Sequence, residues 1–290
     1  MSNTFKSFAI IGAGGYLGRP IYESLLASSA SKVVVLSRPD SDKTFASHPK
    51  QVVEKVKLDD VDAVAAVLKK HGVEVLVSAI AIVGFGTQTA LADAAKRADV
   101  QLFVPSEFGI PSEGAQGLLG SKAKVCDYAK SIGLPFLRLY TGLFMESIPS
   151  AGSVETGKFV YLERGTAPLS VTSIIDIGGF LAHVLTTLTP AELQGVTFRI
   201  EGERTSFAEL AALYHEVKGL PAESLGVDRF RAEVPKADFK VPLASVVNEG
   251  KGVITYCHVQ GKDLGQGVIS NGLWEGHSWK SAREVIRELK

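Results

Sequence analysis

Short apolar runs alternate with amphipathic helical patterns through the first half of the chain. The runs are rich in valine and isoleucine and carry few polar positions, as expected of strands that are buried on both faces. They predict strands at 7–11, 32–37, 51–56, 74–79, 101–105 and 135–140. Helical patterns between them predict helices at 15–28, 60–71, 87–97 and 121–132. A chain that alternates strand and helix in this order predicts a parallel sheet with helices on both faces.

The pattern becomes less regular after about residue 147. It predicts strands at 159–162 and 195–201, a strand end and a long helix over 171–188, and a last amphipathic helix over 279–290. Either Thr205 or Ser206 can cap the helix that follows the 195–201 strand. Glu209 stands three residues after Ser206 and completes a capping box with it. This half of the chain is therefore expected to be a mixed α/β region.

A glycine-rich turn joins the first strand to the first helix in the sequence Phe-Ala-Ile-Ile-Gly-Ala-Gly-Gly-Tyr-Leu-Gly. Gly12, Gly15 and Gly18 fit the pattern Gly-x-x-Gly-x-x-Gly. Glycines at a tight turn let backbone N–H groups approach phosphate oxygens and let the helix pack close to the sheet. The helix N-terminus adds free N–H donors and the positive end of its dipole. The turn predicts a dinucleotide pyrophosphate site made by Gly12, Gly14, Gly15, Tyr16, Leu17 and Gly18.

The strand, glycine turn and helix define the predicted fold class. It is α/β: a Rossmann-type doubly wound parallel sheet with helices on both faces, plus a smaller mixed α/β C-terminal substrate region. We expect the nucleotide-binding domain at 1–146 and the substrate-binding region at 147–290. Part of 165–200 is expected to pack back onto the sheet. Ligands of such folds bind at the carboxyl ends of the strands.

The end of the second strand bears on the choice of cofactor. A site for NAD usually has Asp or Glu there, because a carboxylate accepts from the ribose 2′-OH. This chain has Arg38 instead, whose planar guanidinium suits a 2′-phosphate, and Lys43 adds a second positive charge. These two residues favour NADP, that is NADPH in its reduced form. Asp40 keeps NAD as an alternative. The other interpretation is that Arg38 is a solvated loop residue with no role in binding.

Small and polar residues follow the fourth and fifth strands. Ser78, Ala79 and Ile80 are predicted to let the backbone approach the cofactor, although strand core before a turn would give the same residues. The fifth strand runs into Phe-Val-Pro-Ser-Glu-Phe-Gly at 103–109. A proline in this stretch stops strand pairing. Its polar and aromatic side chains, including Ser106 and Phe108, are then expected in the crevice.

The Pro-Ser-Glu-Phe-Gly segment resembles the signature of the isoflavone reductase-like family, in the NmrA-like branch of the atypical short-chain dehydrogenases. The glycine spacing, the basic residue at 38 and a lysine, Lys122, thirteen residues before Pro135 are similar to that family as well. The resemblance is dense over residues 5–146 and thinner afterwards. It implies a Rossmann fold, NADPH and an oxidoreductase. Thr141-Gly142 departs from the Ser-Asn of many plant members, which bears on the substrate.

The resemblance also implies roles for particular residues. Lys122 matches the catalytic acid/base near the nicotinamide, where a desolvated lysine with a lowered pKa can exchange a proton near neutral pH. Phe144 matches a phenylalanine that packs near the nicotinamide, and Phe108 is expected to wall the same pocket. The alternative interpretation is that Lys122 is a surface helix lysine with no catalytic role, as expected for Lys124 and Lys130. A Tyr-x-x-x-Lys match at 214–218 lies in the C-terminal half and is not expected to act.

Three functions follow from the resemblance. The first is a NADPH-dependent reductase that transfers a hydride to a small apolar, aromatic or phenolic molecule, with Lys122 moving the proton. The second is a non-catalytic NADP(H)-binding redox sensor of the NmrA type that acts through a protein partner. The third is a quinone or aldehyde reductase of the same branch, which shares the cofactor site and differs in the pocket.

Composition excludes several other classes. The 31 Lys and Arg residues balance 31 Asp and Glu residues, so nothing favours nucleic acid or an anionic membrane. Cys126, Cys257 and the 6 histidines fit no metal spacing, and the cysteines are expected to be free thiols. The longest apolar stretch, at 73–85, is too short to span a bilayer. We expect a cytosolic protein without a signal peptide.

Overall fold

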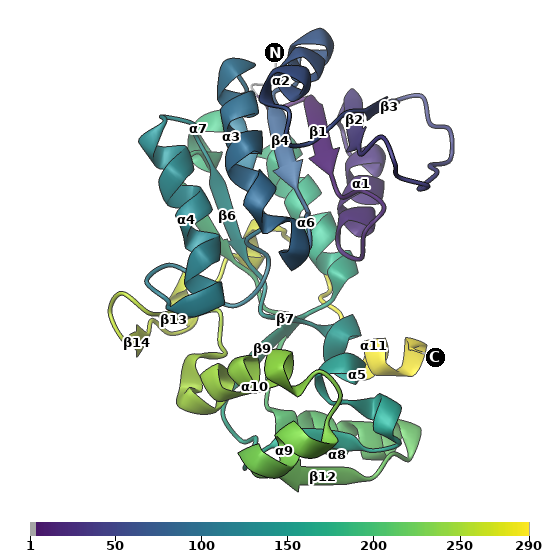
Figure 1. Cartoon of the computed structure of the whole chain (residues 1–290), viewed down its shortest axis with the longest axis vertical. Coiled ribbons are helices and arrows are strands. Elements are labelled where there is room, and N and C mark those ends of the chain that lie inside the picture. The colour runs from purple at the N-terminus through teal and green to yellow at the C-terminus, as the bar shows by residue number, and fades with distance from the viewer. Residues whose placement is uncertain (1–3, 290) are drawn as a thin grey trace. The chain divides into compact units, whose positions relative to one another are not determined.

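The computed structural model describes residues 4–289 and divides the chain into two compact units. The first unit consists of Met1–Glu107, Ser112–Leu139 and Ile177–Phe198. The second unit consists of Phe108–Pro111, Tyr140–Asp176 and Arg199–Lys290. Each unit is therefore built from segments that are far apart in the sequence. Figure 1 labels the elements of both.

A five-stranded parallel sheet forms the centre of the first unit. Its strands lie in the order β3-β2-β1-β4-β5. Their bounds are β1 (Ser7–Ile11), β2 (Lys32–Ser37), β3 (Gln51–Lys55), β4 (Val75–Ser78) and β5 (Leu102–Val104). The order reverses between β1 and β4, because β1 pairs with β2 on one side and β4 on the other. The predicted parallel sheet and α/β fold class are confirmed.

Helices cover this sheet, as predicted. They are α1 (Gly18–Ala27), α2 (Val61–His71), α3 (Gln88–Arg97), α4 (Gly117–Ser131), α6 (Ile174–Thr187) and α7 (Pro190–Leu193). α2, α3 and α4 share one buried apolar cluster with strand residues such as Ala9, Val34 and Phe103. α6 lies against α1, since a Cβ on Gly178 would come within 2.6 Å of the Pro20 backbone (Figure 1). Buried helix faces and strands thus make a layered core.

The sixth predicted strand is a correction. β6 (Leu137–Tyr140) lies outside the five-stranded sheet and pairs with β10 (Val196–Arg199). A single parallel bridge joins Phe103 to Phe136, and the Phe103 N–H donates to the Pro135 carbonyl over 2.8 Å. The next bond of this parallel register would come from the N–H of residue 105, and Pro105 has none to donate, so the pairing stops after one bridge.

Helix ends differ from the predictions for local reasons. α1 begins at Gly18 instead of residue 15, because the Gly15 N–H donates to the Gly12 carbonyl within the turn. α4 begins one turn earlier than predicted. The last helix, α11 (Ala282–Glu288), is shorter than 279–290 because Ser281 forms a capping box with Glu284. Capping by Ser206 at α8 (Phe207–Lys218) is confirmed.

The second unit combines short strands with helices. Its remaining elements are β7 (Leu143–Phe144), α5 (Ile148–Ala151), β8 (Phe159–Leu162), β9 (Leu169–Thr172), β11 (Glu203–Thr205), β12 (Ala222–Leu225), α9 (Val227–Glu233), α10 (Ala237–Val246), β13 (Tyr256–Cys257) and β14 (Lys262–Asp263). Tyr214 is buried in its core, with its ring 5.1 Å from that of Phe159. This packing gives Tyr214 a structural place, as the sequence led us to expect.

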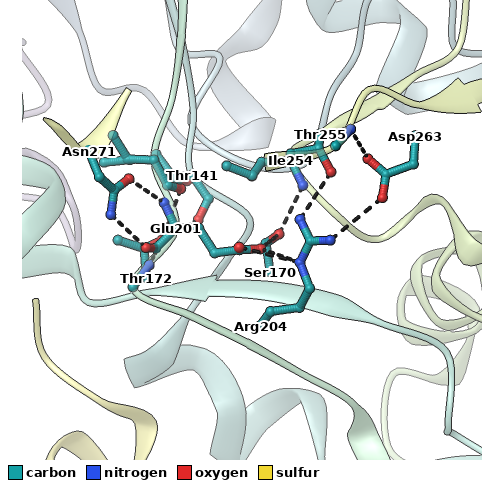
Figure 2. A network of polar contacts seen from close by, with 12 residues as sticks. Thr141, Ser170, Thr172, Glu201, Arg204, Ile254, Thr255, Asp263 and Asn271 are labelled. Carbon is teal, nitrogen blue, oxygen red and sulfur yellow. Dashed lines mark hydrogen bonds and ion pairs between the residues drawn. The ribbon is translucent and has the colours of Figure 1, made fainter. Parts of the chain in front are cut away.

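A polar network holds several segments of the second unit together (Figure 2). The Glu201 carboxylate, whose side chain is 7% exposed, accepts from the Ser170 hydroxyl and from Arg204 Nε, which lies 3.1 Å away. Arg204 also donates to Thr255 Oγ1 over 3.0 Å, and its Nη1 lies 3.5 Å from an Asp263 carboxylate oxygen. The network therefore ties β9 and β11 to the chain around β13 and β14.

Membrane-spanning helices and clusters of potential metal ligands are both absent from residues 4–289. None of the described helices is long and apolar enough to cross a membrane. Within the same described part, His, Cys, Asp and Glu side chains form no group of three or more that could hold a metal ion. Cys126 and Cys257 are free thiols.

Candidate active site

The glycine turn lies directly against the end of β4. The Gly15 N–H donates to the Gly12 carbonyl over 2.8 Å, and Gly12 has a φ of +85° that favours glycine. A Cβ on Gly12 would lie 2.5 Å from the Ala79 carbonyl oxygen, and one on Gly18 would lie 1.9 Å from the Gly12 oxygen. Both positions are therefore closed to larger residues. Gly14, Gly15 and Tyr16 are exposed, and Leu17 is buried behind them.

The N-terminus of α1 follows this turn. Leu17 is its N-cap, and within the described residues no side chain caps the helix there. First-turn N–H groups of a helix have no partner inside the helix. An exposed glycine turn in front of an uncapped helix N-terminus is an arrangement that accepts an anion.

Arg38 and Lys43 lie on the loop after β2. Lys43 reaches the glycine turn, since a Cβ on Gly14 would lie 2.9 Å from Lys43 Cγ. Arg38 is exposed, and its Nε lies 3.8 Å from an Asp40 carboxylate oxygen. This exposed ion pair leaves the guanidinium accessible to a stronger anion, because such pairs contribute little free energy. The structure thus brings Lys43 to the turn, and the contact of Arg38 with a 2′-phosphate stays a prediction.

The ends of β4 and β5 are joined by hydrogen bonds. The Ser106 hydroxyl donates to the Ile80 carbonyl over 2.9 Å, and the Ser106 N–H donates to Gln88 Oε1 over 2.8 Å. The Ser78 hydroxyl is buried and has no hydrogen-bond partner among the described residues. A buried polar atom without a partner is rare in folded proteins. Ser78 is thus a place where a bound ligand would satisfy a polar group.

A buried charged cluster lies at the beginning of α4, where Lys122 is partly buried. The cluster centres on Glu107, which is 1% exposed. The Ser112 hydroxyl is 2.7 and 2.8 Å from its two carboxylate oxygens, and Arg138 Nε lies 3.6 Å from one of them. Cys126 Sγ lies 3.7 Å from the same oxygen. Lys122 and Glu107 attract each other electrostatically.

Burial and charge compete within this cluster. Burial lowers the pKa of the Lys122 amine, and the Glu107 carboxylate opposes that shift. Burial raises the pKa of Glu107, against the attraction of Lys122 and Arg138 and the hydrogen bond from Ser112. Burial and the neighbouring Glu107 raise the pKa of the Cys126 thiol to about 12. Cys126 is therefore protonated and unreactive, while Lys122 has the lowered pKa that proton exchange requires.

The two predicted aromatic residues belong to the second unit. Phe108 is buried in the short segment 108–111, and Phe144 ends β7, where it pairs with Thr172 of β9. Gly142 has a φ of +68°, and a Cβ on it would lie 2.1 Å from the Ser170 carbonyl oxygen. Glycine at 142 is thus required by β9. The predicted places of Phe108 and Phe144 beside a nicotinamide stay predictions.

Four residues of this region were missed at the sequence level. Glu107, Ser112 and Arg138 form the charged cluster with Lys122, and Gln88 fixes Ser106. A charged residue inside an apolar strand, as Arg138 is in Leu-Arg-Leu-Tyr, is a signal that could have indicated a buried partner. The identity of that partner depends on the tertiary fold.

Known proteins resemble this chain over most of its length. The model of the NmrA-like family matches residues 4–240. "Oxidoreductase BOA1" of Botryotinia fuckeliana is 28% identical over 231 residues, which are 73% of this chain and 75% of that protein. The NADPH complex of leucoanthocyanidin reductase from Vitis vinifera has 19% identity and a TM-score of 0.79, covering 97% of this chain and 98% of that one.

A further solved structure has the same fold. It is described as "AtPrR2 with NADP+ and (+)pinoresinol" and has 17% identity and a TM-score of 0.77, covering 98% of this chain and 99% of that one. These likenesses confirm the predicted Rossmann-like fold, and the family match covers the glycine turn, the charged cluster and much of the second unit. This chain belongs to the NmrA-like family.

Proposed function

We propose that this protein is a NADPH-dependent reductase that transfers a hydride to a small apolar, aromatic or phenolic molecule, with Lys122 as the acid/base. A relative is named as an oxidoreductase, and proteins of the same fold are described in complex with NADPH or with NADP+ and pinoresinol. The observation that carries the proposal is the partly buried Lys122 amine with its lowered pKa. A purely structural surface lysine would have neither property.

The first unit fits a dinucleotide on its own geometry. The glycine turn packs so closely on the end of β4 that a Cβ on Gly12 would clash with the Ala79 carbonyl oxygen, and Lys43 lies over Gly14. The buried Ser78 hydroxyl offers a polar atom without another partner among residues 4–289. In the proposal, the turn holds the pyrophosphate, Arg38 and Lys43 hold the 2′-phosphate, and Ser78 to Ile80 line the cofactor. When bound, NADPH supplies the hydride from its nicotinamide C4.

Lys122 supplies the proton chemistry in this proposal. A group whose pKa lies near the working pH is present in both protonation states and exchanges protons efficiently. The Lys122 ammonium donates a proton to an oxygen that gains negative charge, or the neutral amine removes a proton from a phenol. The second unit supplies the substrate contacts, with Phe108 and Phe144 as aromatic walls.

One observation favours the alternative function, a non-catalytic NADP(H) sensor. Glu107 is a fixed carboxylate that attracts Lys122, so the lysine could serve as a structural counter-charge. A sensor would bind NADP(H), prefer one redox state and form a stable complex with a protein partner, without turnover. The glycine turn and Arg38 fit both functions equally.

Steady-state turnover separates the two functions. We would follow NADPH oxidation by the purified protein against phenolic ethers, enones, quinones and aldehydes, beside NADPH binding measured by titration. The proposal expects turnover with at least one class and its loss in Lys122→Met, with NADPH affinity unchanged. The matched control Lys124→Met removes an exposed lysine from the same helix and should keep full turnover. Tight NADPH binding without turnover by any class would support the sensor.

A further inference from the structure

The charged cluster assigns a role to Glu107, a residue that the proposed function above does not use. We propose that Glu107 is a positioning residue for Lys122: its buried carboxylate fixes the amine on the inner face of α4 and keeps it protonated between turnovers. The inference rests on the proposed function for its catalytic meaning. The effect of the Glu107 carboxylate on the protonation of Lys122 depends only on the geometry of the first unit.

The Glu107 carboxylate is held from several segments. The Ser112 hydroxyl is within hydrogen-bond distance of both of its oxygens, at 2.7 and 2.8 Å. Arg138 of β6 approaches one oxygen to 3.6 Å through Nε, and Cys126 of α4 approaches the same oxygen to 3.7 Å. With 1% exposure, Glu107 has almost no contact with water. Its charge therefore has a fixed position and acts through a medium that screens poorly.

Helix geometry places Lys122 toward this carboxylate. Lys122 and Cys126 stand four residues apart on α4, so they share one face of the helix. Cys126 lies at Glu107, and side chains on a helix lean toward its N-terminus, which is where Lys122 stands. Lys124 is exposed and lies on a different face. The Glu107 carboxylate raises the pKa of the Lys122 amine, against the effect of burial.

The other charges around the cluster have their own partners. Arg138 Nη1 lies 3.2 Å from a carboxylate oxygen of Glu113, so the guanidinium is shared between two carboxylates. Asp93 of α3 accepts from the Tyr128 hydroxyl over 2.6 Å. Glu107 is the main charge that acts on Lys122, since the Cys126 thiol is protonated and therefore neutral near neutral pH. Glu107 is thus the charge that determines whether the amine keeps its proton.

Burial and the Glu107 charge have opposite effects on the protonation of Lys122. Burial alone would push the lysine toward its neutral form, which cannot donate. The carboxylate restores enough of the ammonium for the amine to give a proton to a substrate oxygen. The amine then becomes neutral and takes a proton back from water after product leaves. Glu107 keeps its own protonation state throughout, so it acts on Lys122 without exchanging a proton itself.

Glu107→Gln tests the inference by removing the charge while keeping the shape. The readout is the pH dependence of Lys122 acylation by a small amine-reactive reagent, followed on its peptide by mass spectrometry. Only the neutral amine reacts, so the midpoint of the curve reports the titration of Lys122. We expect this midpoint to fall by about one pH unit or more. Asp127→Asn, which removes an exposed carboxylate from the same helix, is expected to leave it unchanged.

Turnover gives the second readout. The limb of the kcat/KM profile that Lys122→Met abolishes should shift in Glu107→Gln toward lower pH by the same amount as the acylation midpoint, with NADPH affinity unchanged. An unchanged midpoint in Glu107→Gln overturns the inference whether or not the protein turns over. A shifted midpoint in a protein without any turnover supports the inference and overturns the proposed reductase function.

A second variant covers the case in which Glu107→Gln does not fold. Ser112→Ala removes the hydroxyl that fixes both carboxylate oxygens but keeps the charge. It is expected to shift the Lys122 midpoint downward by less than Glu107→Gln would, because the carboxylate loses a hydrogen bond that favours its charged form. An unchanged midpoint in this variant would overturn the inference.

Discussion

Each unit buries a glutamate beside an arginine, and the two clusters differ in what surrounds the carboxylate. In the second unit, the Ser170 hydroxyl and Arg204 Nε donate to the Glu201 carboxylate, and Asn271 exchanges two hydrogen bonds with the Glu201 backbone (Figure 2). In the first unit, Glu107 faces two cationic side chains, Arg138 and Lys122, and its pKa is raised by burial. In the Glu201 network the carboxylate is satisfied by hydrogen bonds. In the Glu107 cluster, burial and the attraction between charges have opposite effects on protonation.

The difference separates structural from functional polarity. A network in which each polar group has a well-placed partner fixes the positions of chain segments. A cluster in which desolvation and attraction oppose each other has perturbed pKa values, which are common at functional sites. The two clusters should therefore respond to mutation in different observables, stability for the Glu201 network and turnover for the Glu107 cluster.

The largest expected effect is on turnover by Lys122→Met. Loss of a general acid/base typically lowers the rate by about 10²- to 10⁴-fold. We expect a fall of that order in kcat, with a smaller loss in the free energy of unfolding than Glu201→Ala causes, because Glu107 loses Lys122 but keeps Arg138 beside it. Steady-state kinetics and urea unfolding check the two parts. A variant that lost stability and kept its kcat would place Lys122 with the structural cluster.

Glu201→Ala should do the reverse. It leaves Arg204 without its main partner and removes the acceptor of Ser170, which we expect to lower the free energy of unfolding by about 2–4 kcal/mol. Urea unfolding measures the loss, and the pH dependence of Lys122 acylation should stay that of the native protein. Glu249→Ala, which breaks an exposed ion pair with Lys251 in the same unit, is the control. Its cost should be about 0–1 kcal/mol.

Cysteine reactivity sharpens the contrast between buried and accessible groups. Burial and Glu107 raise the pKa of Cys126 to about 12, so its thiolate is scarce at pH values near neutral. Cys257 is partly exposed in the second unit. At a pH of about 8, iodoacetamide should alkylate Cys257 at least about 100-fold faster than Cys126. Comparable rates, measured by peptide mass spectrometry, would contradict the burial of the Glu107 cluster.

The smallest effect concerns a charge that is not buried. Arg38 forms an exposed pair with Asp40, so Arg38→Ala should leave the free energy of unfolding within about 0.5 kcal/mol. It should nevertheless lower the ratio of NADPH to NADH affinity by roughly tenfold, because the 2′-phosphate loses a donor. Titration with each nucleotide checks this. An unchanged ratio would move the choice of cofactor to Lys43 or to the backbone.

The parts that sequence predicts are those that local chemistry determines. β1 and β2 match their predicted bounds, and Ser206 caps α8, because apolar runs and a capping box act over a few residues. β6 leaves the sheet after one bridge because Pro105, the next residue that would donate to it, lacks an N–H, and the sequence shows this proline but not its partner strand. The predicted role of Lys122 depends on a family resemblance, since nothing in the local sequence distinguishes it from Lys124.

The Glu107 cluster could not be predicted in the same way. Glu107 follows β5, Lys122 and Cys126 lie on α4, and Arg138 lies on β6, so their meeting depends on how these elements pack. A single sequence gives the charges but not their partners. The Ser106–Gln88 contact has the same origin, as α3 brings its glutamine to the end of β5.

The discontinuous make-up of the first unit has a consequence for biosynthesis. Ile177–Phe198 belongs to that unit, and its α6 packs on α1 through Gly178. During translation, therefore, residues 1–146 emerge before α6, the helix that packs on α1. A nascent chain that ends near residue 146 leaves exposed the apolar face of α1 on which α6 packs. Residues up to Phe198 must be synthesised before the first unit can complete its packing. Folding of residues 1–146 therefore depends on the synthesis of the later segment.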